Sequence, residues 1–200
     1  YARVFGAERA LVRTQFVSGT HALATVLFGL LRPGDGLVSI TGTPYDTMQT
    51  VIGYAHESTG SLKEFGIKYD ELPMQDGGVD LAGISRVITP ETKVALIQRS
   101  RGYSERRPLS IADIREITAR VKAANPACIC FVDNCYGEFV DTSEPTDVET
   151  VDIMAGSLIK NPGGGLAPTG GYIAGRSDLV EAASYRLTAP GMGDELGASL

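Results

Sequence analysis

Short apolar runs of strand length alternate along this chain with segments of helical periodicity. The clearest helix is expected after Ser110, a good N-cap residue, because isoleucine and valine then recur every three or four residues as far as Val121. Such alternation indicates βαβ units, in which a mostly parallel sheet is covered by helices on both faces. The pattern predicts strands over residues 10–16, 37–41, 66–72, 93–98, 128–132, 153–157 and 171–174, and helices over residues 20–31, 47–53, 80–87, 111–123 and 178–186.

The chain is expected to form one α/β domain over residues 1–200. Its 43% apolar residues can build a buried core, and its 24 glycines suit tight turns between strands and helices. No internal repeat, low-complexity tract or linker divides it. Because the chain starts at Tyr1 and stops at Leu200 within a glycine-rich stretch, we expect it to be a segment of a longer protein.

The net charge indicates which partners are disfavoured, and the cysteines bear on metal binding and on the cellular compartment. A formal charge of -6 argues against nucleic acid or an anionic membrane surface, since phosphate groups favour an excess of Lys and Arg. No apolar run approaches the ~20 residues that a membrane-spanning helix needs, and no signal-peptide pattern is present. Cys128, Cys130 and Cys135 have no CxxC spacing, so no metal site is predicted and the cytoplasm is the expected compartment.

Ligands of open α/β sheets bind beyond the carboxyl ends of the strands, so the residues after each predicted strand are candidates for a site. Ser18-Gly-Thr-His21 follows the first strand and begins a helix, where backbone N–H groups and the helix dipole favour a phosphate. An ordinary N-cap is the commoner role of such a match. Tyr45 follows the second strand and could stack on a flat ring, although packing is the usual role of a tyrosine there.

Charged residues follow two further strands. Arg99 and Arg101 come after the strand over residues 93–98, where they could grip a carboxylate or phosphate; a solvated loop or a subunit contact is an equally good interpretation. Asp133 directly ends a buried apolar strand, where an unpaired charge would be costly. A protonated pyridine nitrogen would satisfy that carboxylate, and so would a metal ion.

Lys160 follows the apolar run over residues 151–159 and precedes an unusually glycine-rich loop. Partial desolvation would favour the neutral amine that forms imines. The alternative is a surface lysine in a glycine-rich turn, but Ser157 three residues earlier and the glycine loop favour a functional role. A Walker phosphate loop is excluded because its lysine follows the glycines, whereas this one precedes them.

The order of these features resembles that of fold-type I pyridoxal 5'-phosphate (PLP) enzymes, which have the aspartate aminotransferase fold. Val-Asp-Asn-x-Tyr around Asp133 and Ser-x-x-Lys ending at Lys160 resemble the branch that acts in cysteine and methionine metabolism. Longer motifs span nearly the whole chain and are similar to the methionine gamma-lyase-like family, also called aluminium-resistance proteins. These motifs begin at Gly6, Val17, Thr43, Ile97, Val132 and Ala155.

The resemblance implies a role for each matching residue. Lys160 would be the Schiff-base lysine, and Asp133 would keep the pyridine nitrogen protonated so that the ring accepts electrons. Tyr45 would stack on the ring and serve as an acid or base. The remaining implied cofactor-binding residues are Gly19, Thr20 and Ser157 for the phosphate, and Asn134 for orienting neighbouring groups.

The implied activity is that of a PLP-dependent carbon–sulfur lyase that acts on a small sulfur amino acid by β- or γ-elimination. Three alternatives stay open: transamination on the same core, a PLP-binding stress-response protein with little catalysis, and a domain without PLP whose Asp133 binds a metal. The resemblance also implies that the protein forms a homodimer or a homotetramer. The amino-terminal arm of such enzymes and their carboxyl-terminal small domain, which holds the substrate-binding arginine, are expected outside this segment. Within it, Arg99 and Arg101 are the only candidates for that arginine.

Overall fold

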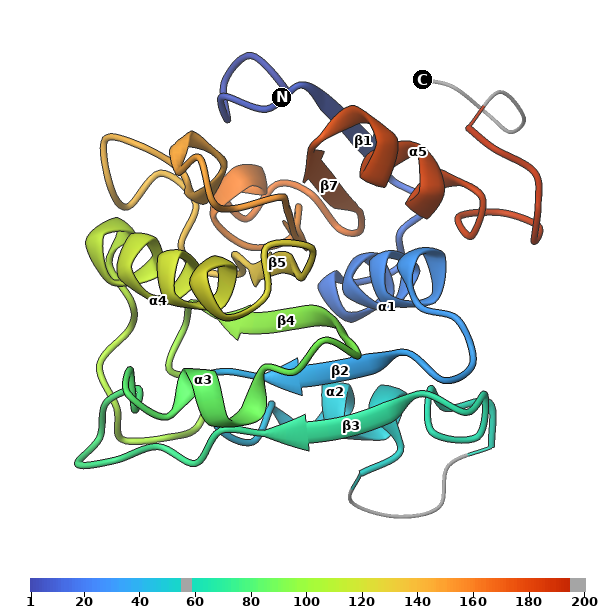
Figure 1. The fold of residues 1–200 in the computed structure, drawn as a ribbon. Coiled ribbons are helices and arrows are strands. Elements are labelled where there is room, and N and C mark those ends of the chain that lie inside the picture. Colours follow the sequence, from blue (N-terminus) through green and yellow to red (C-terminus); the bar gives the residue numbers. More distant parts are fainter. Residues whose placement is uncertain (55–58, 195–200) are drawn as a thin grey trace.

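The computed structural model describes residues 1–54 and 59–194, and these form a seven-stranded sheet with helices on both faces (Figure 1). The strands are β1 (Arg9–Arg13), β2 (Gly36–Ser39), β3 (Lys68–Glu71), β4 (Thr92–Gln98), β5 (Ile129–Asp133), β6 (Ile153–Ser157) and β7 (Gly171–Gly175). The α-helices are α1 (Gly19–Leu30), α2 (Asp46–Ile52), α3 (Ile84–Val87), α4 (Ile111–Ala124) and α5 (Ser177–Ser184), and the 3₁₀ helices are η1 (Pro145–Asp147) and η2 (Asn161–Gly163).

The strands lie in the order β1-β7-β6-β5-β4-β2-β3. Neighbours from β6 through β5, β4 and β2 to β3 pair in parallel, whereas β7 is antiparallel to both β6 and β1. The predicted α/β domain with a mostly parallel sheet is therefore confirmed, with β7 as the exception. The parallel strands bring the loops that follow β2, β4, β5 and β6 to one edge of the sheet.

Each predicted strand has a counterpart in the structure, because the central strands are apolar on both of their faces. In β5, Ile129 and Phe131 pack on the side of α1, α2 and α5, while Cys130 and Val132 pack on the side of α3 and α4. Cys128 and Cys130 are fully buried, as the sequence predicts for cysteines in a core strand. None of the described helices is long and apolar enough to cross a membrane.

Helix α4 begins where its N-cap residue predicts. The Ser110 hydroxyl accepts a hydrogen bond from the Asp113 backbone N–H (3.2 Å), and the Asp113 carboxylate accepts one from the Ser110 N–H (2.8 Å). This reciprocal capping box satisfies two N–H groups that the first turn leaves free. The buried face of the helix carries Ile111, Ile114 and Ile117, which have the predicted spacing.

Several predicted elements are shorter in the structure, among them β3, which spans Lys68–Glu71 instead of residues 66–72. Helix α3 begins at Ile84 instead of residue 80, since the Asp80 side chain accepts a hydrogen bond from the Gly83 N–H (2.9 Å) and holds a turn that competes with the helix. Strand β1 ends at Arg13 instead of residue 16. Phe16 is nevertheless completely buried, as part of the core on the α1 side.

Candidate functional site

A cavity of about 460 Å³ lies at the edge of the sheet where the parallel strands end. Its wall is formed by residues from the start of α1 and from the segments that follow β2, β4, β5 and β6. The structure thus brings together side chains that are distant in the sequence. Five of the predicted site residues line this one cavity: Gly19, Thr20, Tyr45, Asp133 and Lys160.

The first turn of α1 forms one end of the cavity. Ser18 caps the helix, and its hydroxyl accepts a hydrogen bond from the His21 N–H (3.1 Å). Within the described part of the chain, the backbone N–H groups of Gly19 and Thr20 have no hydrogen-bond acceptor. Together with the partial positive charge of the helix N-terminus, these free donors form a site suited to an anion.

Gly19 and Ser157 lie against each other. A β-carbon added at Gly19 would lie 3.0 Å from the β-carbon of Ser157 and 3.0 Å from Cys135 Sγ, so glycine lets α1 start this close to the end of β6 without a shift of either neighbour. Ser157 itself is completely buried, and its hydroxyl accepts a hydrogen bond from the Ile159 N–H (3.3 Å). Its side chain is not on the cavity wall, and a direct contact with phosphate stays a prediction.

Tyr45 forms a second wall as the N-cap residue of α2. Its hydroxyl shares a hydrogen bond with the Thr20 hydroxyl (3.1 Å), and its backbone N–H donates to Gln98 Oε1 (3.3 Å). Burial, and then the nearby charge of Asp133, raise the pKa of the Tyr45 phenol well above its usual value. The side chain is therefore a neutral phenol with a fixed direction, suited to stacking and to donating a hydrogen bond.

Asp133 ends β5, as predicted, and only 3% of it is exposed. One carboxylate oxygen accepts a hydrogen bond from the Cys135 N–H (3.1 Å). Burial raises the pKa of this carboxyl to about 6, which the Cys135 hydrogen bonds and the charge of Lys160 offset only in part. No group of three metal-ligating side chains occurs among the residues described. Because the carboxylate is buried and its pKa is raised, a cationic partner in the cavity would stabilise its charged form.

This carboxylate gives the cofactor-free, full-length protein a measurable pH dependence. Its pKa is 3.8 without the protein environment and about 6 in the fold, so the folded state holds the proton more tightly than the unfolded chain does. Stability is consequently highest below pH 3.8 and falls as the pH rises towards 6, by at most about 3 kcal/mol. Asp133→Asn should be more stable than the parent at pH 7 and equal to it at pH 4. Urea denaturation at both pH values checks this, and a pH-independent difference would contradict it.

Lys160 reaches the cavity from the loop after β6. It is half-buried and lies directly before the 3₁₀ helix η2. Its amine donates a hydrogen bond to the Tyr136 hydroxyl and lies 3.9 Å from the centre of the Tyr136 ring. The amine is thus held at the cavity wall that Tyr136 and Asp133 also line.

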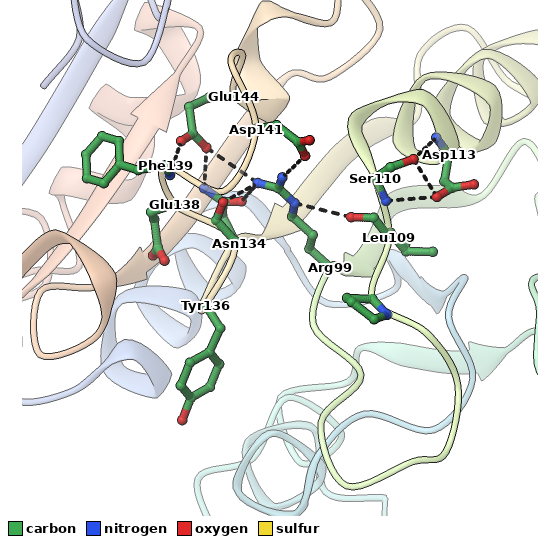
Figure 2. Close-up of polar contacts among 12 residues, drawn as sticks. Arg99, Leu109, Ser110, Asp113, Asn134, Tyr136, Glu138, Phe139, Asp141 and Glu144 are labelled. Atoms are coloured by element: carbon green, nitrogen blue, oxygen red, sulfur yellow. Dashed lines mark hydrogen bonds and ion pairs between the residues drawn. The ribbon is translucent and has the colours of Figure 1, made fainter.

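Arg99 lies in a different environment from the one that a substrate-binding role requires (Figure 2). Its guanidinium donates to Asn134 Oδ1 and the Gly137 carbonyl (both 2.8 Å), to Asp141 (2.6 Å) and to the Leu109 carbonyl (3.3 Å). Only 2% of the residue is exposed. Because its donors are used within the protein, the structure gives no support to a substrate-binding role for Arg99.

Asn134 belongs to the same buried cluster. Its amide donates to Glu144 (2.9 Å) and to the Tyr172 hydroxyl (3.2 Å), and it is completely buried. Asn134 therefore orients neighbouring protein groups and does not line the cavity; a direct contact with the cofactor stays a prediction. Arg101 is exposed and lines a neighbouring cavity of about 450 Å³ instead, so its substrate role also stays a prediction.

Arg99 together with Asn134, Asp141 and Glu144, called the Arg99 cluster below, should contribute strongly to the stability of the fold. In Arg99→Met, Glu144 would lose a buried cationic neighbour at 3.5 Å and Asn134 would lose its donor. We expect the free energy of unfolding of the full-length protein to fall by about 3 to 5 kcal/mol. Arg101→Met is the matched control and should change it by less than about 0.5 kcal/mol. Chemical denaturation measures both, and equal effects would show that the cluster is not a stabilising unit.

Three functional or supporting residues escape sequence reasoning. Tyr136 is the tyrosine of the Val-Asp-Asn-x-Tyr motif, but the sequence assigned no role to it. Glu138 and Tyr172 form a buried hydrogen bond (2.8 Å), and burial raises the pKa of the Glu138 carboxyl to about 7. No sequence pattern predicts this pair, because Glu138 lies in the loop after β5 and Tyr172 lies in the antiparallel strand β7.

Comparison with known proteins agrees with this geometry. Residues 1–200 match the family model described as methionine gamma-lyase. A Listeria monocytogenes structure, provisionally named a cystathionine beta-lyase involved in aluminium resistance, is 57% identical with a TM-score of 0.96; the match covers 100% of this chain and 49% of that one. A Clostridium novyi structure named a carbon–sulfur lyase involved in aluminium resistance is 54% identical with a TM-score of 0.91, covering 96% and 46%.

A more distant structure shares the fold alone. The pyridoxal-5'-phosphate dependent protein YhfS from Escherichia coli is 18% identical with a TM-score of 0.67, over 91% of this chain and 42% of that one. The present chain spans about half the length of the two close relatives. Since the family model covers all of residues 1–200, the chain belongs to the methionine gamma-lyase family.

Proposed function

We propose that this chain is the cofactor-binding large domain of a PLP-dependent carbon–sulfur lyase with the fold-type I architecture. The observation that carries the proposal is the convergence of four chemically distinct groups on one cavity. They are a lysine amine, a buried carboxylate, an aromatic phenol and the free N-terminus of a helix. Membership of the methionine gamma-lyase family supports lyase chemistry for such a cavity.

These residues fit PLP group by group. Its phosphate needs hydrogen-bond donors, and the N–H groups of Gly19 and Thr20 lack acceptors in the described chain. Its pyridine nitrogen, when protonated, would supply the cation that the buried Asp133 carboxylate lacks. Its aldehyde requires a primary amine, which Lys160 provides at the same cavity, and Tyr45 offers a ring for stacking.

In the proposed reaction, PLP supplies an electron sink when it is bound. Asp133 holds the proton on the pyridine nitrogen, and the first turn of α1 binds the phosphate. The amine of Lys160 would take the proton from the α-carbon of the substrate. The proton that Lys160 takes would pass to the departing sulfur at the β or γ carbon, and the neutral phenol of Tyr45 would donate a hydrogen bond to that sulfur.

The substrate carboxylate needs a cation that this cavity does not offer besides Lys160, judged from the described residues of its wall. We therefore infer that the whole protein completes its site with further residues, from its remaining length or from a neighbouring subunit of a homodimer or homotetramer. The substrate class is a small sulfur-containing amino acid. A cytoplasmic location suits the free, buried Cys128 and Cys130 and the family's amino-acid metabolism.

The reaction is tested by product analysis with the full-length, PLP-loaded protein and single sulfur amino acids, namely cystathionine, methionine and cysteine. Elimination predicts thiol or sulfide and a keto acid in equal amounts, with no second keto acid required. A keto acid that forms only when an acceptor keto acid is added, without thiol, would establish transamination instead. The absence of both products from all three substrates would contradict the lyase proposal and favour a PLP-binding stress-response protein.

A further inference from the structure

Tyr136 contacts the amine of Lys160 in two ways. The Tyr136 hydroxyl accepts a hydrogen bond from Nζ, and the ring presents its face to the same nitrogen, whose distance from the ring centre is 3.9 Å. A hydroxyl acceptor and an aromatic face both favour a cation and together define its direction. The ring also lies on the walls of two adjoining cavities, the candidate site and the cavity beside Arg99.

The backbone at Tyr136 has an uncommon conformation. Its φ angle of 66° is in the left-handed region, which a bulky aromatic residue rarely adopts. Phe139, three residues later in the same loop, has a φ of 62°. Such conformations persist where the surrounding structure fixes them, and they concentrate at functional sites.

The Arg99 cluster supplies that surrounding structure. Arg99 donates to the carbonyl of Gly137, the residue directly after Tyr136, and a β-carbon at Gly137 would lie 2.5 Å from Arg99 Cδ. The Phe139 N–H donates to Glu144 (2.7 Å), which Asn134 also contacts. Figure 2 shows the Tyr136 side chain pointing away from this cluster, so that the cluster holds the loop while the phenol projects from it.

A second link ties the Tyr136 loop to the Lys160 loop. The side-chain amide of Asn161, the residue after Lys160, donates to the carbonyls of Tyr136 (3.2 Å) and Glu138 (3.0 Å). The two loops are thus joined through the backbone as well as through the phenol and the amine. The relative position of Tyr136 and Lys160 is set by this pair of links and by the buried arginine behind them.

We propose that Tyr136 is a positioning residue for Lys160, holding the amine at the cavity wall so that it meets the cofactor aldehyde from a defined direction. The cofactor step rests on the proposed function, whereas the contact between phenol and amine does not. Removing the hydroxyl should free the amine for small reagents and, at the same time, slow its capture of PLP. If the substitution only loosened the local structure, the rate of reaction with small reagents and the rate of PLP capture would change in the same direction.

The first measurement needs no cofactor. Acetic anhydride labels lysines of the cofactor-free, full-length protein, and peptide mass spectrometry gives the rate at Lys160 relative to the exposed Lys93. Tyr136→Phe should raise this ratio about threefold and Tyr136→Leu about tenfold, since the first removes the acceptor and the second also removes the ring. Tyr54→Phe is the matched control, as Tyr54 is exposed and lines none of the cavities described. Ratios equal to the parent's in both variants would overturn the proposal.

The second measurement follows the borohydride-stable adduct on Lys160 after PLP is added. Its rate of formation should fall about fivefold in Tyr136→Phe and stay unchanged in Tyr54→Phe. A rate that rises in parallel with the acetylation rate would overturn the positioning role. If the parent itself formed no adduct, the proposed function would fail, and the acetylation ratios would still decide whether Tyr136 holds the amine. Thermal denaturation of each variant shows whether it is folded.

Discussion

Replacing Lys160 by alanine in the full-length protein is expected to abolish its visible absorption with PLP and its lyase turnover. The amine is the only lysine nitrogen on the described wall of the cavity, so nothing else there can attach the aldehyde covalently. The fold should be nearly unchanged, because the half-buried side chain makes its contacts at the cavity edge with Tyr136 and not in the core. Absorption spectra, turnover and thermal midpoints of variant and parent measure these effects.

The matched control is Lys93→Ala, which removes the exposed lysine of β4. It should retain the parent's spectrum and turnover. The assignment of Lys160 would be wrong if Lys160→Ala kept both the visible band and a borohydride-stable adduct. A large loss of thermal stability in Lys160→Ala would instead show that the lysine has a structural role that the geometry does not indicate.

Asp133→Asn should lower turnover by about 100-fold or more, equivalent to about 3 kcal/mol at the transition state, while PLP affinity changes far less. An amide cannot hold a proton on the pyridine nitrogen, so the ring would accept electrons poorly. The N–H groups at the start of α1 and the ring of Tyr45 are untouched by the substitution and would still bind the cofactor. Steady-state kinetics and PLP titration of the full-length variant separate the two quantities.

Asp70→Asn provides the same chemical change at an exposed position of β3 and should leave turnover unaltered. Turnover of Asp133→Asn within a factor of two of the parent would remove Asp133 from the mechanism. A parallel loss of PLP affinity and turnover would assign the carboxylate to cofactor binding alone.

The parts of the fold that the sequence predicts well are those with strong local signals. Strand β5 is apolar on both faces and ends in Asp133, and β6 has the predicted bounds. Ser110 begins α4 because a capping box is a property of four consecutive residues. The ends of these strands predict which edge of the sheet binds a ligand. They therefore also predict that Gly19, Tyr45 and Lys160 lie together at one cavity.

The parts that the sequence does not reveal depend on contacts between distant segments. Arg99 and Arg101 are indistinguishable in a loop after a strand, yet Arg99 is buried because its partners Asn134 and Asp141 lie 35 and 42 residues away. Strand β7 pairs antiparallel with β1, which lies near the start of the sequence, as well as with β6, the strand directly before it. The left-handed φ of Tyr136 likewise has no local signal, since tyrosine disfavours it.

The most direct measurement of PLP attachment is peptide mapping of the full-length parent after borohydride reduction. Protein incubated with PLP, reduced and digested should carry one pyridoxyl phosphate group per chain, and fragmentation should place it on Lys160. Cavity geometry predicts this site because Lys160 is the one lysine on the described wall. Absence of an adduct, or an adduct placed mainly on another lysine such as Lys93 or Lys122, would contradict the assignment of this cavity as a PLP site.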